Sequence, residues 1–212
     1  MGTRFWIPGT VLLLASCATL AFSDEAARPM VFNFDADAAG ATPKGFTADV
    51  GTWKVVADDT APSKPNALAQ LAENENKVFN VALAADTRFK DVDLSVRMKA
   101  VAGKLDQGGG PVWRAKDAKN YYVCRWNPLE DNFRFYTVVD GKRKQLADAD
   151  LKAEAGWHTI RVVAKADAVE CFFDGKKVLE AKDDTFKDAG KIGLWTKADA
   201  VTHFDDLAAT GK

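Results

Sequence analysis

The chain has 212 residues, with 29 basic side chains against 30 acidic ones and a formal net charge of −1 at pH 7. Because both signs are interspersed, the chain lacks the basic surface expected of a nucleic-acid-binding protein. The length left after a targeting segment, about 190 residues, suits a single domain with a substantial hydrophobic core.

The first 23 residues have the features of a bacterial targeting segment. Arg4 supplies a short positive region, and residues 5–14 form an apolar run. The motif LASC that follows matches a lipobox, in which Cys17 would be acylated and become the mature N-terminus. Ordinary signal-peptide cleavage before Asp24 is an alternative. A third interpretation is an uncleaved membrane anchor, for which the apolar run is short. Each alternative places the folded domain, residues 24–212, outside the cytoplasm.

The rest of the chain shows the period-two alternation of β-strands, interrupted by turn residues. Asp140-Gly141 and Asp174-Gly175 each predict a tight hairpin turn, since both turn positions need positive φ. Two stretches, 148–156 and 183–190, have room for one helical turn each. The predicted strands are 30–34, 52–57, 67–72, 78–83, 92–101, 110–115, 121–126, 132–139, 142–147, 158–165, 168–174, 176–181, 191–197 and 201–209. Many short strands without crossover helices predict an all-β, two-sheet antiparallel jelly-roll sandwich.

Two cysteines remain beyond the lipobox, Cys124 and Cys171, each inside a predicted strand. An oxidising compartment permits a disulfide between them, whereas their apolar neighbours favour two small buried thiols. The two histidines, His158 and His203, do not add up to a zinc site, because no C-x-x-C or H-E-x-x-H spacing is present.

Four segments resemble a family of bacterial extracytoplasmic domains that is named after 3-keto-disaccharide hydrolase. The resemblance covers residues 30–209 and implies the concanavalin A-like lectin/glucanase fold, which is related to laminin-G-like modules. It also implies a carbohydrate ligand, either bound or hydrolysed. The segments are GTWKVVADDTAPSKPNALAQ, PVWRAKDAKNYYVCRWNPLEDNFRFYTVVDGKRKQL, GWHTIRVVAKADAVECFFDGKKVLEAKDDTF and GKIGLWTKADAVTHFDDL.

The chain departs from the best-known hydrolases of this superfamily at their paired carboxylates. Those enzymes carry E-x-D-x-x-E on one strand, and glycosidases generally need two carboxyl groups. Here Asp91 and Asp93 are two residues apart, so that both would point to the same face of a strand, but no third acid follows them. The sequence therefore does not predict an ordinary glucanase.

Glu130 is the candidate catalytic residue, within the motif NPLEDN and close to Arg125 in the sequence. An acid beside Arg125 would be held ionised, which suits a base or a hydrogen-bond acceptor. Because the proton next to the ketone of a 3-keto sugar is acidic, one base can suffice for elimination. The alternative interpretation of Glu130 is a polar turn residue.

The strands at 121–126 and 132–139 also predict a carbohydrate-binding face. Tyr121 shares a face with Arg125, and Tyr136 shares one with Asn132, so that rings and hydrogen-bonding groups alternate on one side. A plain solvent-exposed face is the alternative. The candidate ligand-binding residues are Trp113, Asn120, Tyr121, Asn132, Tyr136 and Trp195, with Trp53, Trp126 and Trp157 assigned to the core.

Asp35 and Asp37 near the start of the domain would meet Asp205 and Asp206 near its end if the terminal strands pair. Such a cluster would offer carboxylates to Ca²⁺, although EF-hand spacing is absent and solvated turns are the favoured interpretation. We therefore expect no cofactor.

These observations favour a carbohydrate-binding domain of the bacterial cell envelope or periplasm, attached to the membrane only through a lipid on Cys17. One alternative is a hydrolase or lyase that acts on 3-keto-glycosides, with Glu130 as its base and Arg125 beside it. A second alternative is a structural envelope module without a ligand.

Overall fold

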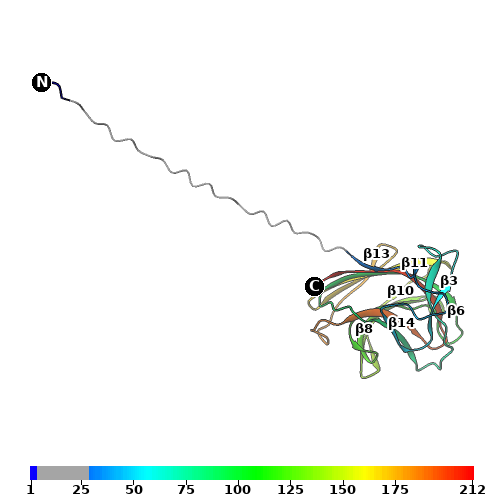
Figure 1. Cartoon of the computed structure of the whole chain (residues 1–212). Coiled ribbons are helices and arrows are strands. Elements are labelled where there is room, and N and C mark those ends of the chain that lie inside the picture. Colours follow the sequence, from blue (N-terminus) through cyan, green and yellow to red (C-terminus); the bar gives the residue numbers. More distant parts are fainter. Residues whose placement is uncertain (4–28) are drawn as a thin grey trace.

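The structure is a computed structural model that describes residues 1–3 and 29–212, and it consists of two antiparallel β-sheets packed face to face (Figure 1). No helix occurs in these two ranges. The predicted lipobox cysteine, Cys17, and the predicted cleavage site before Asp24 lie outside the described residues.

The first sheet, called the back sheet below, has eight strands. In spatial order they are β13 (Lys176–Lys182), β12 (Ala168–Phe173), β11 (Trp157–Lys165), β6 (Val92–Ala102), β15 (Val201–Gly211), β4 (Asn66–Gln70) and β3 (Trp53–Ala57), with β1 (Met30–Phe32) also paired to β15.

The second sheet, called the front sheet, has seven strands. Their order is β10 (Lys142–Asp150), β9 (Asn132–Val139), β8 (Asn120–Asn127), β7 (Gly110–Asp117), β14 (Lys191–Lys197), β5 (Phe79–Ala84) and β2 (Phe46–Val50). Both sheets mix neighbours in sequence with distant segments, as jelly rolls do.

The predicted fold class is confirmed, and the fourteen predicted strands are all present with ends shifted by a few residues. Sequence analysis missed β2, in which only Phe46 is buried, so the segment shows little alternation. The two helical turns considered at 148–156 and 183–190 are absent. Both Asp-Gly hairpins form as predicted, with φ of +50° and +75° at Asp140-Gly141 and +46° and +80° at Asp174-Gly175.

The main hydrophobic core lies between the sheets. The front sheet contributes large rings, and the back sheet contributes mostly aliphatic side chains. Cys124 and Cys171 are both free thiols in this core, as the buried-thiol interpretation predicts. Burial raises the pKa of the Cys124 thiol well above its ordinary value, which keeps it protonated.

The outer face of the front sheet, which points away from this core, carries a second hydrophobic cluster. Its fully buried members are Val81, Leu83, Val112, Ala115, Tyr121, Val123, Tyr136, Val138 and Trp195. A sheet face turned away from the core is normally open to solvent, so this face must be covered by its own curvature and side chains.

The contact between Arg143 and Phe79 demonstrates that curvature. Arg143 is on β10 and Phe79 is on β5, and four strands lie between β10 and β5 in the sheet. In a flat sheet, strands five places apart would be about 24 Å from each other. The guanidinium carbon of Arg143 nevertheless lies 5.4 Å from the centroid of the Phe79 ring. The front sheet therefore curls until side chains from distant strands meet over its outer face.

Arg114 joins three loops at one end of the sandwich. This residue is 2% exposed, and its guanidinium donates hydrogen bonds to the carbonyl oxygens of Lys90 (2.6 Å), Ala166 (2.7 Å) and Phe186 (3.0 Å). Without it, the buried carbonyl group of Phe186 and the partly buried ones of Lys90 and Ala166 would lose their hydrogen-bond partner.

We therefore predict that Arg114→Leu lowers the free energy of unfolding by about 3 kcal/mol or more. Chemical denaturation of the variant and the parent protein measures this difference. Arg88→Leu is the matched control, because Arg88 is exposed and should tolerate the change. Equal destabilisation by the two substitutions would contradict the role assigned to Arg114.

Candidate functional site

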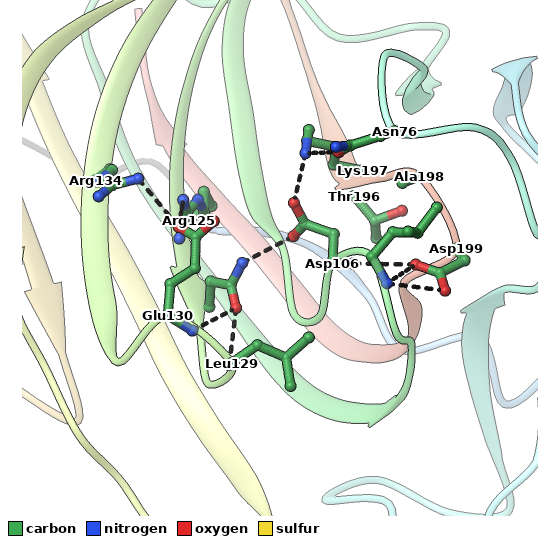
Figure 2. Close-up of polar contacts among 12 residues, drawn as sticks. Asn76, Asp106, Arg125, Leu129, Glu130, Arg134, Thr196, Lys197, Ala198 and Asp199 are labelled. Atoms are coloured by element: carbon green, nitrogen blue, oxygen red, sulfur yellow. Dashed lines mark hydrogen bonds and ion pairs between the residues drawn. The ribbon is translucent and has the colours of Figure 1, made fainter.

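The candidate site is a group of charged and amide side chains at one end of the outer face of the front sheet (Figure 2). The strands β8, β9 and β14 contribute to it, together with the β8–β9 turn and the loop between β6 and β7. We call this group the polar cluster, and it comprises Asp106, Arg125, Asn127, Glu130, Asn132, Arg134 and Lys197.

The carboxylate of Glu130 is held through one of its two oxygens. Its Oε2 accepts hydrogen bonds from Arg125 Nη2 (2.9 Å), Arg134 Nη1 (3.0 Å) and Asn132 Nδ2 (3.0 Å). None of the described residues bonds Oε1, and the side chain of Glu130 is 44% exposed. The site therefore presents a fixed, solvent-accessible hydrogen-bond acceptor.

The same contacts determine the ionisation of Glu130. Partial burial opposes the charged form, but the hydrogen bonds from Asn132 and Arg125 and the positive charges of Arg125 and Arg134 outweigh it. The pKa of Glu130 is therefore lower than its ordinary value. An ionised carboxylate is a good acceptor, and it cannot act as a proton donor near neutral pH.

The β8–β9 turn directs Glu130 toward these partners. The side-chain oxygen of Asn127 accepts hydrogen bonds from the backbone N–H of Leu129 (2.9 Å) and of Glu130 (3.2 Å). This is an Asx-type turn, in which an asparagine side chain takes the place of a backbone acceptor. Asp131 completes the reversal with φ of +48°.

Asp106 is the second carboxylate of the polar cluster, and it is almost completely buried. Its Oδ1 accepts from Asn127 Nδ2 (2.9 Å), and its Oδ2 pairs with Lys197 Nζ (2.9 Å). Lys197 also bonds the side chain of Asn76. Burial raises the pKa of Asp106, although the hydrogen bond and charge of Lys197 act in the opposite direction.

The loop that carries Asp106 is fixed at both ends. The carboxylate of Asp199 accepts the backbone N–H groups of Lys104 (2.7 Å), Leu105 (3.0 Å) and Asp106 (3.0 Å). On the other side, Gly109 passes so close to the sheet that an added Cβ would lie 2.2 Å from a backbone oxygen. Glycine is required there because the backbone itself fills the space.

Of the predicted site residues, Arg125, Glu130, Asn132 and Tyr136 come together. The hydroxyl of Tyr136 lies 3.3 Å from Arg125 Nη2. Tyr121 and Trp195 lie farther along the same outer face, where Trp195 Nε1 donates to the Tyr121 hydroxyl (3.0 Å). Tyr121 and Trp195 are each at most 1% exposed and are not open to a ligand in this structure.

Trp113 is placed elsewhere, and the prediction that it stacks on a ligand is wrong. Its side chain lies in the core between the sheets, 0% exposed, with ring centroids 5.6 Å from Tyr122 and 5.3 Å from Phe135. A ring packed in this way has no face left for a ligand.

Asn120 also lies apart from the polar cluster, because it begins β8 and Asn127 ends it. Seven residue steps along a strand span roughly 23 Å. Asn120 instead caps the neighbouring turns by donating to Asp117 (3.0 Å) and accepting from the backbone N–H of Asp140 (3.1 Å). Its assignment as a ligand-binding residue does not fit this position.

Sequence reasoning missed Asp106, Lys197, Asn76 and Asp199. The one available signal was the glycine run after Asp106 in GKLDQGGG, since consecutive glycines mark a close backbone approach. Lys197, Asn76 and Asp199 come close to Asp106 because β14 and β5 are the strands next to β7 in the spatial order of the front sheet.

The structure gives three of the four terminal aspartates, Asp35, Asp37 and Asp205, hydrogen-bond partners elsewhere in the chain. Asp35 accepts the backbone N–H of Asn66 (3.2 Å), and Asp205 accepts the backbone N–H (2.8 Å) and hydroxyl of Ser63. Within the described ranges, no three His, Cys, Asp or Glu side chains are grouped so that they could hold a metal ion. The same ranges contain no helix that is long and apolar enough to cross a membrane.

The model of the 3-keto-alpha-glucoside-1,2-lyase-like domain matches residues 31–209, which is most of the chain. The chain belongs to this family. No curated protein matches it in sequence.

Solved structures resemble this member of the 3-keto-alpha-glucoside-1,2-lyase-like family in fold. A carbohydrate binding module, CBM66, from Bacillus subtilis has a TM-score of 0.66 at 19% identity, covering 79% of this chain and 96% of that one. A Bacillus subtilis protein of unknown function with a galectin-like fold has a TM-score of 0.58 at 12% identity (85% and 98% covered). A putative glycosyl hydrolase from Parabacteroides distasonis has a TM-score of 0.53 at 12% identity (82% and 91% covered).

The lowered pKa of Glu130 predicts a pH-dependent contribution to stability. Because the pKa is lower in the folded chain than the ordinary value of 4.5, the contribution is present above about pH 4.5 and is lost as the pH falls through the folded pKa. We expect Glu130→Gln to lower the free energy of unfolding by about 0.5–1 kcal/mol at pH 7, and by less at pH 3.

Urea denaturation at the two pH values measures this effect. Glu73→Gln serves as the control, since Glu73 is exposed and forms no ion pair with the described residues. An effect of Glu130→Gln that is equal at pH 7 and pH 3 would show that the ion pairs do not contribute.

Proposed function

We propose that the domain binds carbohydrate outside the cytoplasm and that the polar cluster is its ligand-binding site. The observation that carries the proposal is the accessible carboxylate of Glu130, which two arginines and an asparagine hold in place through one oxygen. A fixed, ionised acceptor beside fixed donors suits the hydroxyl groups of a sugar, each of which both donates and accepts.

Apolar side chains beside the polar cluster support the same ligand class. Leu105 precedes Asp106 and is 55% exposed, while Leu129 precedes Glu130 and is 51% exposed. Exposed leucines next to charged side chains offer contact to the C–H groups of a sugar ring, and the charged groups bind its hydroxyls. The family and the structural likeness to CBM66 agree with this proposal.

The first test is titration of the purified chain with a panel of oligosaccharides and 3-keto-disaccharides. We expect Glu130→Gln to weaken binding by about tenfold to a hundredfold, because removing a charged partner from a ligand hydrogen bond costs about 1.5–3 kcal/mol. Glu73→Gln should bind as the parent protein does. Unchanged affinity of Glu130→Gln would rule out the polar cluster as the site.

A second candidate function, cleavage of a 3-keto-glycoside, is favoured by the ionised and accessible carboxylate of Glu130. An ionised carboxylate can accept a proton near neutral pH. Glu130 would remove the C2 proton next to the ketone, and a water molecule would protonate the departing glycosidic oxygen as the bond to C1 breaks.

Product analysis in the same titration distinguishes the two functions. Release of a monosaccharide that Glu130→Gln abolishes at saturating sugar would identify an enzyme, whereas binding without release would identify a binding module. If no sugar binds and none is cleaved, the third possibility, a structural envelope module, is the one that remains.

We also propose that the protein is a lipoprotein of the bacterial cell envelope, anchored through Cys17. The proposal is supported by the lipobox LASC after an apolar run. In a bacterial host, radiolabelled palmitate should label the parent protein and not Cys17→Ala, which should also leave the membrane fraction. Palmitate-free parent protein in the periplasm or medium would instead favour ordinary secretion.

A further inference from the structure

Four rings on the outer face of the front sheet form a group beside the polar cluster, and one of them, Tyr136, is bonded to Arg125. We call them the aromatic platform: Phe79, Tyr121, Tyr136 and Trp195. Three of them are at most 2% exposed although they face away from the core between the sheets. Phe79 is half-buried and packs on Trp195 with ring centroids 5.5 Å apart.

Arg143 lies over this platform. Its guanidinium carbon is 4.2 Å from the centroid of the Tyr136 ring and 5.4 Å from that of Phe79, so the cation bridges two strands across the curled sheet. Arg143 forms no hydrogen bond or ion pair with any residue that the structure describes, and it is only half-buried. Contacts between a cation and a ring are weak near solvent. The side chain can therefore leave without breaking a hydrogen bond within the described protein.

The platform continues directly from the polar cluster. The Tyr136 hydroxyl is 3.3 Å from Arg125 Nη2, and the same nitrogen bonds Glu130. Arg134 and Tyr136 face the same side of β9, two residues and about 7 Å apart. A ligand held by Glu130 and Arg134 would bring its next unit over the ring of Tyr136.

We propose that the aromatic platform is a second carbohydrate subsite, which Arg143 occupies in the free protein and a sugar ring occupies after displacing it. This inference rests on the proposed function, because the first sugar unit is held by the polar cluster. The ring faces that attract a guanidinium also stack on the C–H faces of sugars. A monosaccharide then uses the polar cluster alone, and a disaccharide or longer chain uses both subsites.

The test is calorimetric titration of the full chain with glucose and with the di- to tetrasaccharides of the malto-, cello- and laminari-series. Arg143→Ala should bind the oligosaccharides roughly three- to tenfold more tightly, because no cation has to be displaced. Glucose affinity should not change. Arg143→Lys, which keeps a cation over the rings, and Lys142→Ala, an exposed neighbour on β10, should both resemble the parent protein. Equal or weaker oligosaccharide affinity in Arg143→Ala would overturn the proposal.

A measurement without sugar separates the failure of this inference from that of the proposed function. In a chain with Trp6→Phe and Trp157→Phe, Trp195 is the tryptophan of the outer-face cluster, since Trp53, Trp113 and Trp126 belong to the core between the sheets. Acrylamide should quench its fluorescence more strongly after Arg143→Ala. Unchanged quenching would show that Arg143 does not cover the platform. Increased quenching without binding of any sugar would refute the carbohydrate assignment of both subsites.

Discussion

The curl of the front sheet is the constraint on which both the core and the candidate site depend. Successive residues of a strand point to opposite faces, and in β8 and β9 both sets carry large side chains. One set fills the space between the sheets, and the other is buried on the outer face, where side chains of β10 and β5 meet. The sheet therefore stabilises the fold through two hydrophobic clusters, and the polar cluster lies where the second one ends.

Within the polar cluster, one amide connects two carboxylates that have opposite surroundings. Asn127 accepts the backbone N–H of Glu130 through its oxygen and donates to Asp106 through its nitrogen. Glu130 is surrounded by arginines and remains accessible, whereas Asp106 is buried beside a single lysine. The two acids thus differ in exposure and in the direction of their pKa shifts, while Asn127 is hydrogen-bonded to both residues.

The parts of this structure that depend on local sequence were predictable. Alternation identified fourteen strands, and the Asp-Gly pairs identified two hairpins. Arg125, Glu130 and Asn132 meet because all three lie within eight residues of one hairpin. Trp113 was misassigned for a physical reason: when both faces of a strand are apolar, alternation does not tell which face meets the core. The approach of Lys197 and Asn76 to Asp106 follows from the order of strands in the sheet, which no local pattern encodes.

The Asp174-Gly175 hairpin offers a practical consequence of the sandwich architecture. It joins β12 and β13 at the edge of the back sheet, and the polar cluster belongs to the front sheet. Exposed hairpin tips are sites where short insertions are commonly tolerated. A biotin-acceptor peptide placed there would attach the protein to a sensor chip through the back sheet and leave the outer face of the front sheet open to glycans in the flow.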